Sequence, residues 1–481
     1  MANEKADVSR TEESSTPASH GDAYAAQKDW TVEEEHAVRN KVDRRIFPML
    51  CIVFGLSLVD RTNISAAYVA GLGRDLHLDV GSRYNLALLI FCVSYALFDL
   101  PSNIIIRRVG ARRWLSFLIC AWGLIVLGIG FVDDWRILIV LRTFLGVFEA
   151  GILPGAVYII SSWYRQFESA RRMSICIGAA QLFLAFGPVI AYVLSLIRVG
   201  NGKFSHSWRW IFIVEGMITI VAGFVSPIFL VDFPEKASFL TDRQKYIAVS
   251  RVSLEKVGAH AEHVTLVESL KLLWDWKIGV YCIQHFVVAS SIYSLNFFLP
   301  IILRDNLGFS YALSQLLCTP PYIFGNILPF VIAYWSDKHK LRWPMLVLQS
   351  VSVIIGLLIA MYTKPPGVRY FGIFLAAFGT QANVPATLVY GQNQTAKIQK
   401  RAIVAAAMVS AGGLGGICGS LIFRSQDAPW YFPGMWATIS LQMLYSVVTI
   451  CMSMHFKRMN RLADEGKRTS LEGVKGFRYA P

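Results

Sequence analysis

The sequence predicts an all-α membrane protein in which twelve transmembrane helices form two six-helix bundles. Of the 481 residues, 54% are hydrophobic and only 16% are charged. Apolar stretches of about 20 residues recur along the chain, and a helix of that length spans the hydrocarbon core of a bilayer. One long polar break, at 240–276, divides these stretches into two sets of six.

The chain begins with a polar segment, residues 1–40, that is rich in Glu, Ser, Thr and Ala. We expect a disordered cytosolic tail there, not a signal peptide. Twelve predicted spans follow, at approximately 46–70, 85–107, 114–132, 136–161, 172–197, 209–230, 278–303, 313–336, 342–362, 369–392, 401–423 and 432–456. They give an N-terminal bundle over 41–232, a cytosolic linker over 233–277, a C-terminal bundle over 278–456 and a cytosolic tail over 457–481.

Basic residues in the loops predict the orientation of the spans. If the N-terminus is cytosolic, the loops after the even-numbered spans lie inside the cell and carry most of the Lys and Arg, as short cytosolic loops do. Both termini are therefore expected in the cytosol. The same distribution explains the net charge of +14, and it argues against nucleic-acid binding, which gathers basic residues on one patch.

Charged side chains interrupt two of the predicted spans. Asp60 and Arg61 lie in the apolar run 46–72, and Arg142 and Glu149 lie in the span 136–161. A charge at the centre of a span costs about 2.5–3.5 kcal/mol on insertion scales, so such residues usually face the protein interior and mark a pathway. Arg142 and Glu149 are seven residues apart and project from one helix face, with Gly146 between them. Two acids and two arginines in one half of the chain indicate a coupled carrier of anions.

Several short motifs resemble the major facilitator superfamily over about residues 43–460, and in particular its anion:cation symporter family and the fungal allantoate, nicotinate, pantothenate and biotin permease branch. The residues that carry the resemblance are Asp60-Arg61-Thr62-Asn63-Ile64-Ser65, Pro101-Ser102-Asn103, the run 142–151, Pro154, Trp163-Tyr164, Trp208-Arg209-Trp210 with Glu215, and Tyr293-Ser294-Leu295-Asn296 with Pro300. The chain departs from the superfamily in one place. The usual Asp of the second-to-third loop is missing, and Asp99 stands upstream of it within the predicted helix.

The resemblance implies roles for the four charged residues. The family's matching arginines, here Arg61 and Arg142, are implicated in binding the substrate carboxylate, and the matching acids, Asp60 and Glu149, in cation coupling. A guanidinium holds a carboxylate in a bidentate fork and keeps its charge, so the chemistry agrees. The alternative is that the four groups neutralise one another as a buried structural network.

Uncharged residues near the middle of the spans are candidates for further substrate contacts. They are Tyr95, Gln181, Tyr293, Asn296 and Asn383. Each is equally able to form a hydrogen bond between helices, as is common in membrane bundles. His285 is expected to be a packing residue although an imidazole can relay protons, and Glu215 a partner of loop arginines.

The glycines of 412–419 lack the strand and the Lys-Ser/Thr ending of a phosphate loop. They are expected to pack helices at the moving interface between the halves. No metal-ligand spacing and no cofactor motif stand out.

These features predict a secondary transporter, not an enzyme, that takes up a small organic carboxylate with protons by alternating access. It is expected to be a monomer in the plasma membrane. Two alternatives stay open: an exporter of an acidic metabolite that works by proton antiport, and a nutrient sensor that transports little. The sequence does not identify the carboxylate.

Overall fold

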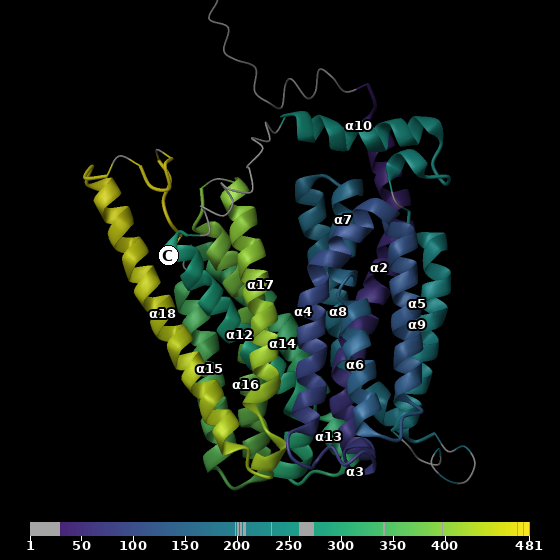
Figure 1. Cartoon of the computed structure of the whole chain (residues 1–481). Coiled ribbons are helices and arrows are strands. Elements are labelled where there is room, and N and C mark those ends of the chain that lie inside the picture. Colours follow the sequence, from purple (N-terminus) through teal and green to yellow (C-terminus); the bar gives the residue numbers. More distant parts are fainter. Residues whose placement is uncertain are drawn as a thin grey trace, which may run out of the picture.

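Two bundles of long helices stand side by side (Figure 1). The computed structural model describes residues 29–197, 199, 202, 204, 208–231, 233–258, 274–339, 342–396, 398–468, 470–474 and 476–480. The expected disordered tail therefore lies mostly outside the described residues, as does part of the linker.

The helices divide between the two bundles in chain order. The N-terminal bundle contains α2 (Val32–Ala67), α4 (Arg83–Val109), α5 (Ala111–Ile129), α6 (Trp135–Glu149), α7 (Ile152–Trp163), α8 (Gln166–Ser195) and α9 (Arg209–Phe229), with the short α3 (Gly73–Asp75). The linker contains α10 (Asp242–Gly258). The C-terminal bundle contains α12 (Trp276–Ile301), α13 (Tyr311–Leu316), α14 (Thr319–His339), α15 (Trp343–Tyr362), α16 (Pro366–Asn393), α17 (Ile398–Ile422) and α18 (Phe432–Asp464).

Within the described residues, ten helical segments are long and apolar enough to cross a membrane. They coincide with ten of the predicted spans. The other two predictions, 46–70 and 313–336, fall on α2 and on α13 with α14. The all-helical fold is confirmed, and the count of twelve spans stays a prediction.

The first helix begins earlier than expected, so part of the predicted tail is ordered. Thr31 and Glu34 form a capping box in which Thr31 Oγ1 accepts from Glu34 N at 3.2 Å and Glu34 Oε2 accepts from Thr31 N at 3.0 Å. This arrangement satisfies backbone N–H groups that a helix start otherwise leaves unpaired. The assignment of residues 32–40 to a disordered tail was therefore wrong.

One predicted span is broken at small residues. The span predicted at 136–161 is interrupted at Ala150 and Gly151, before Pro154, and continues as α7. Just upstream, Gly146 lets α6 approach α4 closely, because a Cβ there would lie only 2.6 Å from the carbonyl oxygen of Phe91. This contact positions the face of α6 that carries Arg142.

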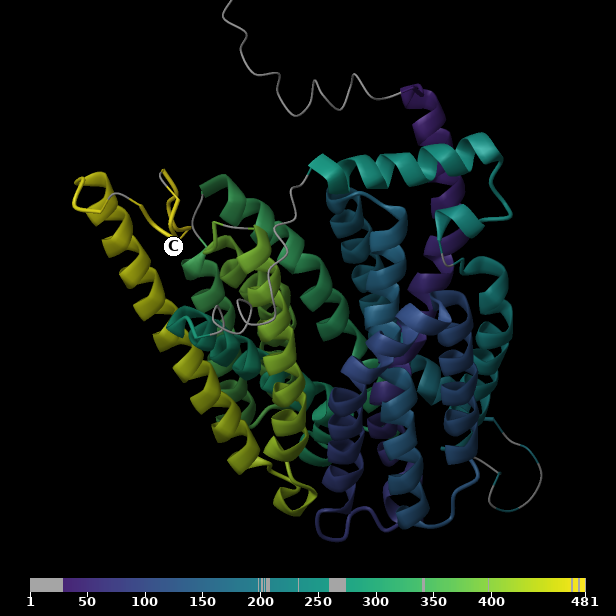
Figure 2. The same ribbon diagram turned by 45° about the horizontal axis from the view of Figure 1, so that its top comes forward.

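The two bundles are joined at one end. In both views α18 slants away from the N-terminal bundle toward the side where α10 lies (Figures 1 and 2). In the described part of the chain, the hydrogen bonds between bundles lie between mid-helix and the opposite, α13 side. Examples are Tyr84 OH to Phe297 O at 3.0 Å and Thr319 Oγ1 to Ala185 O at 2.8 Å.

Helix α10 lies across the end of the N-terminal bundle in both views (Figures 1 and 2). Ion pairs attach it there. Arg251 of α10 forms an ion pair with Glu168 of α8, and the same carboxylate forms a second ion pair with Arg39 of α2 at 3.4 Å. The ring of Tyr246 packs edge-on against Trp30, with centroids 6.2 Å apart. The linker is thus anchored to the first bundle.

The C-terminal segment folds back onto its own bundle. Glu472 pairs with Lys277 of α12 and, at 2.6 Å, with Lys400 of α17. Tyr479 stacks on Phe456 of α18 with ring centroids 4.5 Å apart. Burial raises the pKa of Glu472, but hydrogen bonds from the two lysines outweigh burial and hold this pKa below its ordinary value. The segment therefore clamps the α10-side ends of three helices.

Candidate functional site

An ion pair between Arg61 and Glu149 forms the core of the candidate site. Arg61 Nη2 lies 2.7 Å from Glu149 Oε1, and Arg61 Nε donates to the same oxygen at 3.2 Å. Ser57, one turn before Arg61 on α2, also donates to this oxygen at 2.7 Å. Only 8% of Arg61 and none of Glu149 is exposed, so the pair is formed away from water. Removing either partner would leave an uncompensated buried charge.

The guanidinium of Arg61 also connects the two bundles. Its Nη1 donates to the hydroxyl of Tyr293 on α12 at 3.0 Å. Its Cζ lies 4.5 Å from the ring centroid of Tyr95 and 5.4 Å from that of Phe91, both on α4. Cation–π contacts of this kind favour a desolvated guanidinium. Arg61 is thus held by one acid and two rings of its own bundle and by one hydroxyl of the other.

Asp60 belongs to a different group of residues, because neighbours on a helix point about 100° apart. Asp60 Oδ2 accepts from Trp122 Nε1 of α5 at 2.7 Å and from Thr219 Oγ1 of α9 at 3.5 Å. Glu215 of α9 lies within hydrogen-bonding reach of Asp60, and Asn63 of α2 donates to Glu215. The expectation that Glu215 pairs with loop arginines was wrong, because α9 turns this side chain toward α2.

Arg142 is buried and is not part of an ion pair within the described residues. It is 1% exposed, and its Nε and Nη2 have no hydrogen-bond partner in the described part of the chain. The charges of both Glu149 and Asp60 act on it. Arg142 therefore offers unused donors near both acids, whereas each side-chain nitrogen of Arg61 already donates a hydrogen bond.

The C-terminal bundle contributes uncharged groups near Tyr293. Asn296 lies one turn further along α12, on the same face. Its Oδ1 accepts from Nε2 of Gln381 on α16 at 3.2 Å. Sequence reasoning missed Gln381 and selected Asn383 instead. Either residue marks α16 as polar at mid-helix, but only the helix rotation decides which one faces α12 and Asn296.

Two predicted contact residues are not brought to Arg61. Asn383 is fully buried inside the C-terminal bundle, on the same helix face as Thr387, which bonds the hydroxyl of Tyr445 on α18 at 2.6 Å. Gln181 lies where α8 meets α14, and its backbone oxygen accepts from Asn326 at 3.4 Å. Of the predicted contact residues, Tyr95 and Tyr293 therefore lie at Arg61, whereas Gln181 and Asn383 lie elsewhere in the bundles.

The glycine run of α17 is a packing surface within one bundle. A Cβ at Gly415 would lie 2.6 Å from the carbonyl oxygen of Phe286 on α12, and one at Gly412 would lie 2.9 Å from Cδ2 of His285. His285 is accordingly packed against α17. The predicted packing role of the glycines is confirmed, but their predicted location between the halves was wrong, since α12 and α17 both belong to the C-terminal bundle.

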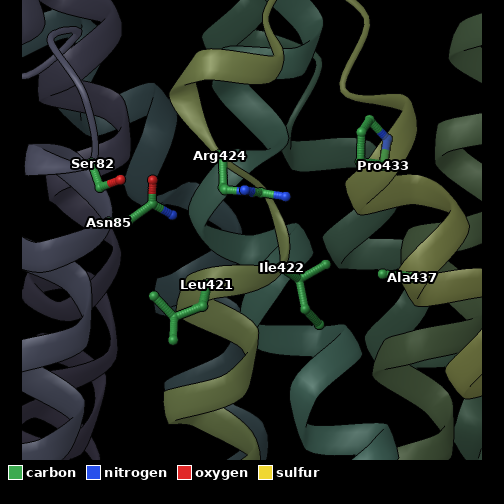
Figure 3. A pocket seen from close by; sticks show the side chains of 7 residues that line it. All are labelled: Ser82, Asn85, Leu421, Ile422, Arg424, Pro433 and Ala437. Atoms are coloured by element: carbon green, nitrogen blue, oxygen red, sulfur yellow. The ribbon is translucent and has the colours of Figure 1, made fainter.

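A pocket between the bundles lies at the α13 side, apart from Arg61, Arg142 and the buried acids. It is lined by Ser82, Asn85, Leu421, Ile422, Arg424, Pro433 and Ala437. Figure 3 shows Ser82 and Asn85 opposite the end of α17. Asn85 Nδ2 donates across this seam to Ser420 O at 2.7 Å and to Phe423 O at 2.6 Å. The pocket therefore belongs to the seam that holds the α13 side together.

The family model of the Major Facilitator Superfamily matches residues 50–422. The chain belongs to this superfamily. It is therefore a multi-pass membrane transporter, in keeping with the all-helical fold.

Two fungal relatives and one solved structure are similar over most of the chain. The MFS transporter prlL of a fungal species is 28% identical over 465 residues, which cover 95% of this chain and 93% of the relative. The high-affinity nicotinic acid transporter of Saccharomyces cerevisiae is 30% identical over 429 residues, covering 89% and 79%. An inward-facing, unoccupied bacterial homolog of the human lysosomal transporter Spinster has a TM-score of 0.68 at 16% identity and covers 89% of this chain and 99% of its own. The last likeness concerns the fold alone.

Proposed function

We propose that this transporter takes up a small organic carboxylate, of a vitamin- or allantoate-like kind, together with protons. The observation that carries the proposal is the position of Arg61, which is paired with a buried acid of one bundle and bonded to a hydroxyl of the other. A carboxylate that binds this guanidinium must compete with Glu149. Substrate binding and proton binding are thereby linked at one pair of residues.

The orientation follows from loop charge. We place the α10 side, with both chain ends, in the cytosol and count α2 and α14 as the two further spans. In that orientation the transporter would be open toward the cytosol, because the hydrogen bonds between bundles in the described residues lie between mid-helix and the α13 side. A plasma-membrane location fits uptake of a nutrient.

The loading step is an exchange of partners. The incoming carboxylate takes the Nε and Nη donors of Arg61 that Glu149 and Tyr293 occupy. Arg142 supplies its unused Nε and Nη2 as a second fork. Glu149 then keeps only the hydrogen bond from Ser57. Losing its counter-ion in a low-dielectric site favours protonation of this carboxyl group.

Asp60 and Glu215 provide a second place for a proton. Two carboxyl groups within hydrogen-bonding reach share a proton, because an ionised carboxylate has no donor. Trp122 and Asn63 each donate to one member of the pair. One proton per monoanion would make transport electroneutral, and a second would add about 2.3 kcal/mol of driving energy per 100 mV.

The nicotinic acid relative supports a carboxylate as the transported group, since nicotinic acid is a carboxylic acid. The test is uptake of a labelled carboxylate panel into proteoliposomes, with and without an inward proton gradient. We expect gradient-driven accumulation of at least one acid by the native protein and its loss in Arg142→Ala. Arg136→Ala is the matched control, because Arg136 lies exposed on the same helix.

Two results would count against the proposal. One is the absence of accumulation of every acid by folded protein. The other is undiminished proton-driven uptake by the double variant Asp60→Asn with Glu149→Gln. Expulsion of a labelled acid in exchange for protons would replace uptake by export.

A further inference from the structure

The two bundles differ sharply in where their charges lie. In the N-terminal bundle, Asp60, Arg61, Arg142, Glu149 and Glu215 are all buried near one another. In the C-terminal bundle, every Asp, Glu, Lys and Arg of the long helices stands within about two turns of a helix end. These end residues are Lys277, Asp337, Lys338, Arg369, Lys400, Arg401, Lys457, Arg458, Arg461 and Asp464. The half of the site opposite Arg61 is therefore uncharged.

This uncharged half still offers hydrogen bonds. The hydroxyl of Tyr293 reaches Arg61, and the amides of Asn296 and Gln381 bond each other at 3.2 Å. A side-chain amide has two N–H donors and an oxygen with two lone pairs. Their mutual bond uses one Gln381 donor and one Asn296 lone pair, and among the described residues these two side chains form no other hydrogen bond. Both Asn296 donors and the oxygen of Gln381 are therefore available for a ligand.

The number of cations in the charged half limits what can bind. Two guanidinium groups stand against three carboxyl groups, Asp60, Glu149 and Glu215. One bound carboxylate with one proton keeps the balance of charge unchanged. A second carboxylate on the same substrate would extend toward Asn296 and Gln381, where the long helices supply no cation. A charge buried without a partner is strongly disfavoured.

We propose that the substrate is a monoanion whose single carboxylate binds Arg61 and Arg142 and whose other end is a neutral hydrogen-bonding group bound by Tyr293, Asn296 and Gln381. Dicarboxylates of the same shape are excluded. This inference rests on the proposed function, since it names the substrate class for the same site. It goes further by assigning Gln381 and Asn296 as the residues that determine specificity.

The test uses pairs of acids that share a shape and differ in charge. 3-Carbamoylbenzoate and isophthalate form an aromatic pair, and adipic acid monoamide and adipate form an aliphatic pair. Each acid competes at pH 7.5 for uptake of the labelled carboxylate that the panel identifies. We expect the monoamide of at least one pair to inhibit at a concentration at least tenfold lower than its dicarboxylate.

Gln381→Arg supplies the missing cation and provides a test by gain of function. In this variant we expect the preference for the monoamide over the dicarboxylate to fall at least tenfold or to be reversed. Gln392→Arg is the matched control, since Gln392 lies on the same helix, three turns nearer the α10 side, and should keep the native preference. Thermal unfolding of each purified variant establishes that it is folded.

The outcomes separate this inference from the proposed function. Accumulation of carboxylates with equal inhibition by both members of each pair overturns the inference and leaves proton-coupled uptake intact. The same holds if folded Gln381→Arg keeps the native preference. If no carboxylate is accumulated at all, the proposed function fails and the inference fails with it.

Discussion

Replacing Glu149 by Gln tests the exchange of partners at Arg61. The amide keeps the shape of the side chain and removes its charge. Arg61 then loses the ion pair at 2.7 Å but keeps the hydrogen bond to Tyr293 and the contact with the Tyr95 ring. In this variant an incoming carboxylate no longer competes with a protein carboxylate for the guanidinium.

The size of the effect follows from burial of the pair. Breaking a buried ion pair by neutralising one partner costs about 3–5 kcal/mol, because Arg61 is left without a counter-ion. The bound carboxylate restores a counter-ion, so part of this energy reappears as affinity. Each 1.4 kcal/mol recovered tightens binding about tenfold. We expect the variant to bind the anion at least tenfold more tightly at pH 7.5.

The pH dependence changes as well. In the native protein, displaced Glu149 takes up a proton, so affinity should rise by up to about tenfold for each unit of acidification. In Glu149→Gln this dependence should disappear. Equilibrium binding of the labelled carboxylate to purified protein between pH 5.5 and 7.5 measures both effects, with the exposed Glu235→Gln as control. If the folded Glu149→Gln variant binds the carboxylate more weakly than the native protein, or keeps the native pH dependence, the exchange of partners is refuted.

Three further predictions concern the scaffold around the site. Gly415→Ala should lower the stability of the protein by about 1–3 kcal/mol, because the added methyl group overpacks against α12. Thermal unfolding measures this effect. Gly413→Ala should leave the stability unchanged, because a Cβ there meets nothing within 4 Å. Asn85→Ala removes two hydrogen bonds across the α13 side, worth about 1–3 kcal/mol together. Spin-label distances across that side should lengthen, and unchanged distances would show that Asn85 does not hold the bundles together there. Because the pKa of Glu472 is lowered, docking of the C-terminal segment should persist above about pH 4.3, the ordinary glutamate value, and weaken as pH falls below it. Limited proteolysis should find the segment released at every pH in Glu472→Gln; equal protection in that variant would show that the lysine contacts do not hold it.

Much of the fold follows directly from the sequence, since each apolar stretch becomes a helix. The prediction of 209–230 differs from α9, Arg209–Phe229, by one residue. The errors have local causes. The capping box at Thr31 starts α2 ahead of its apolar part, and hydropathy does not detect a polar helix start. Likewise α10 is too polar for a span, and its place on the N-terminal bundle depends on ion pairs between distant parts of the chain, such as Arg251 with Glu168.

The site was predicted less completely than the fold. Charge within apolar runs was sufficient to find Arg61, Arg142 and Glu149, which are buried as expected. Their pairing was not predictable, because it depends on which faces of α2 and α6 meet. The same limit explains why Asn383 was chosen and Gln381 was missed. Sequence periodicity gives the rotation of one helix about its axis, but not the neighbour that it faces.

Proton movement driven by substrate tests coupling most directly. Proteoliposomes that contain a pH-sensitive dye receive the identified carboxylate outside, with no initial pH difference. We expect the lumen to acidify faster than in protein-free liposomes, which report passive entry of the neutral acid, and faster than with Arg61→Ala. Entry of labelled carboxylate through the native protein without this extra acidification would contradict proton-coupled uptake.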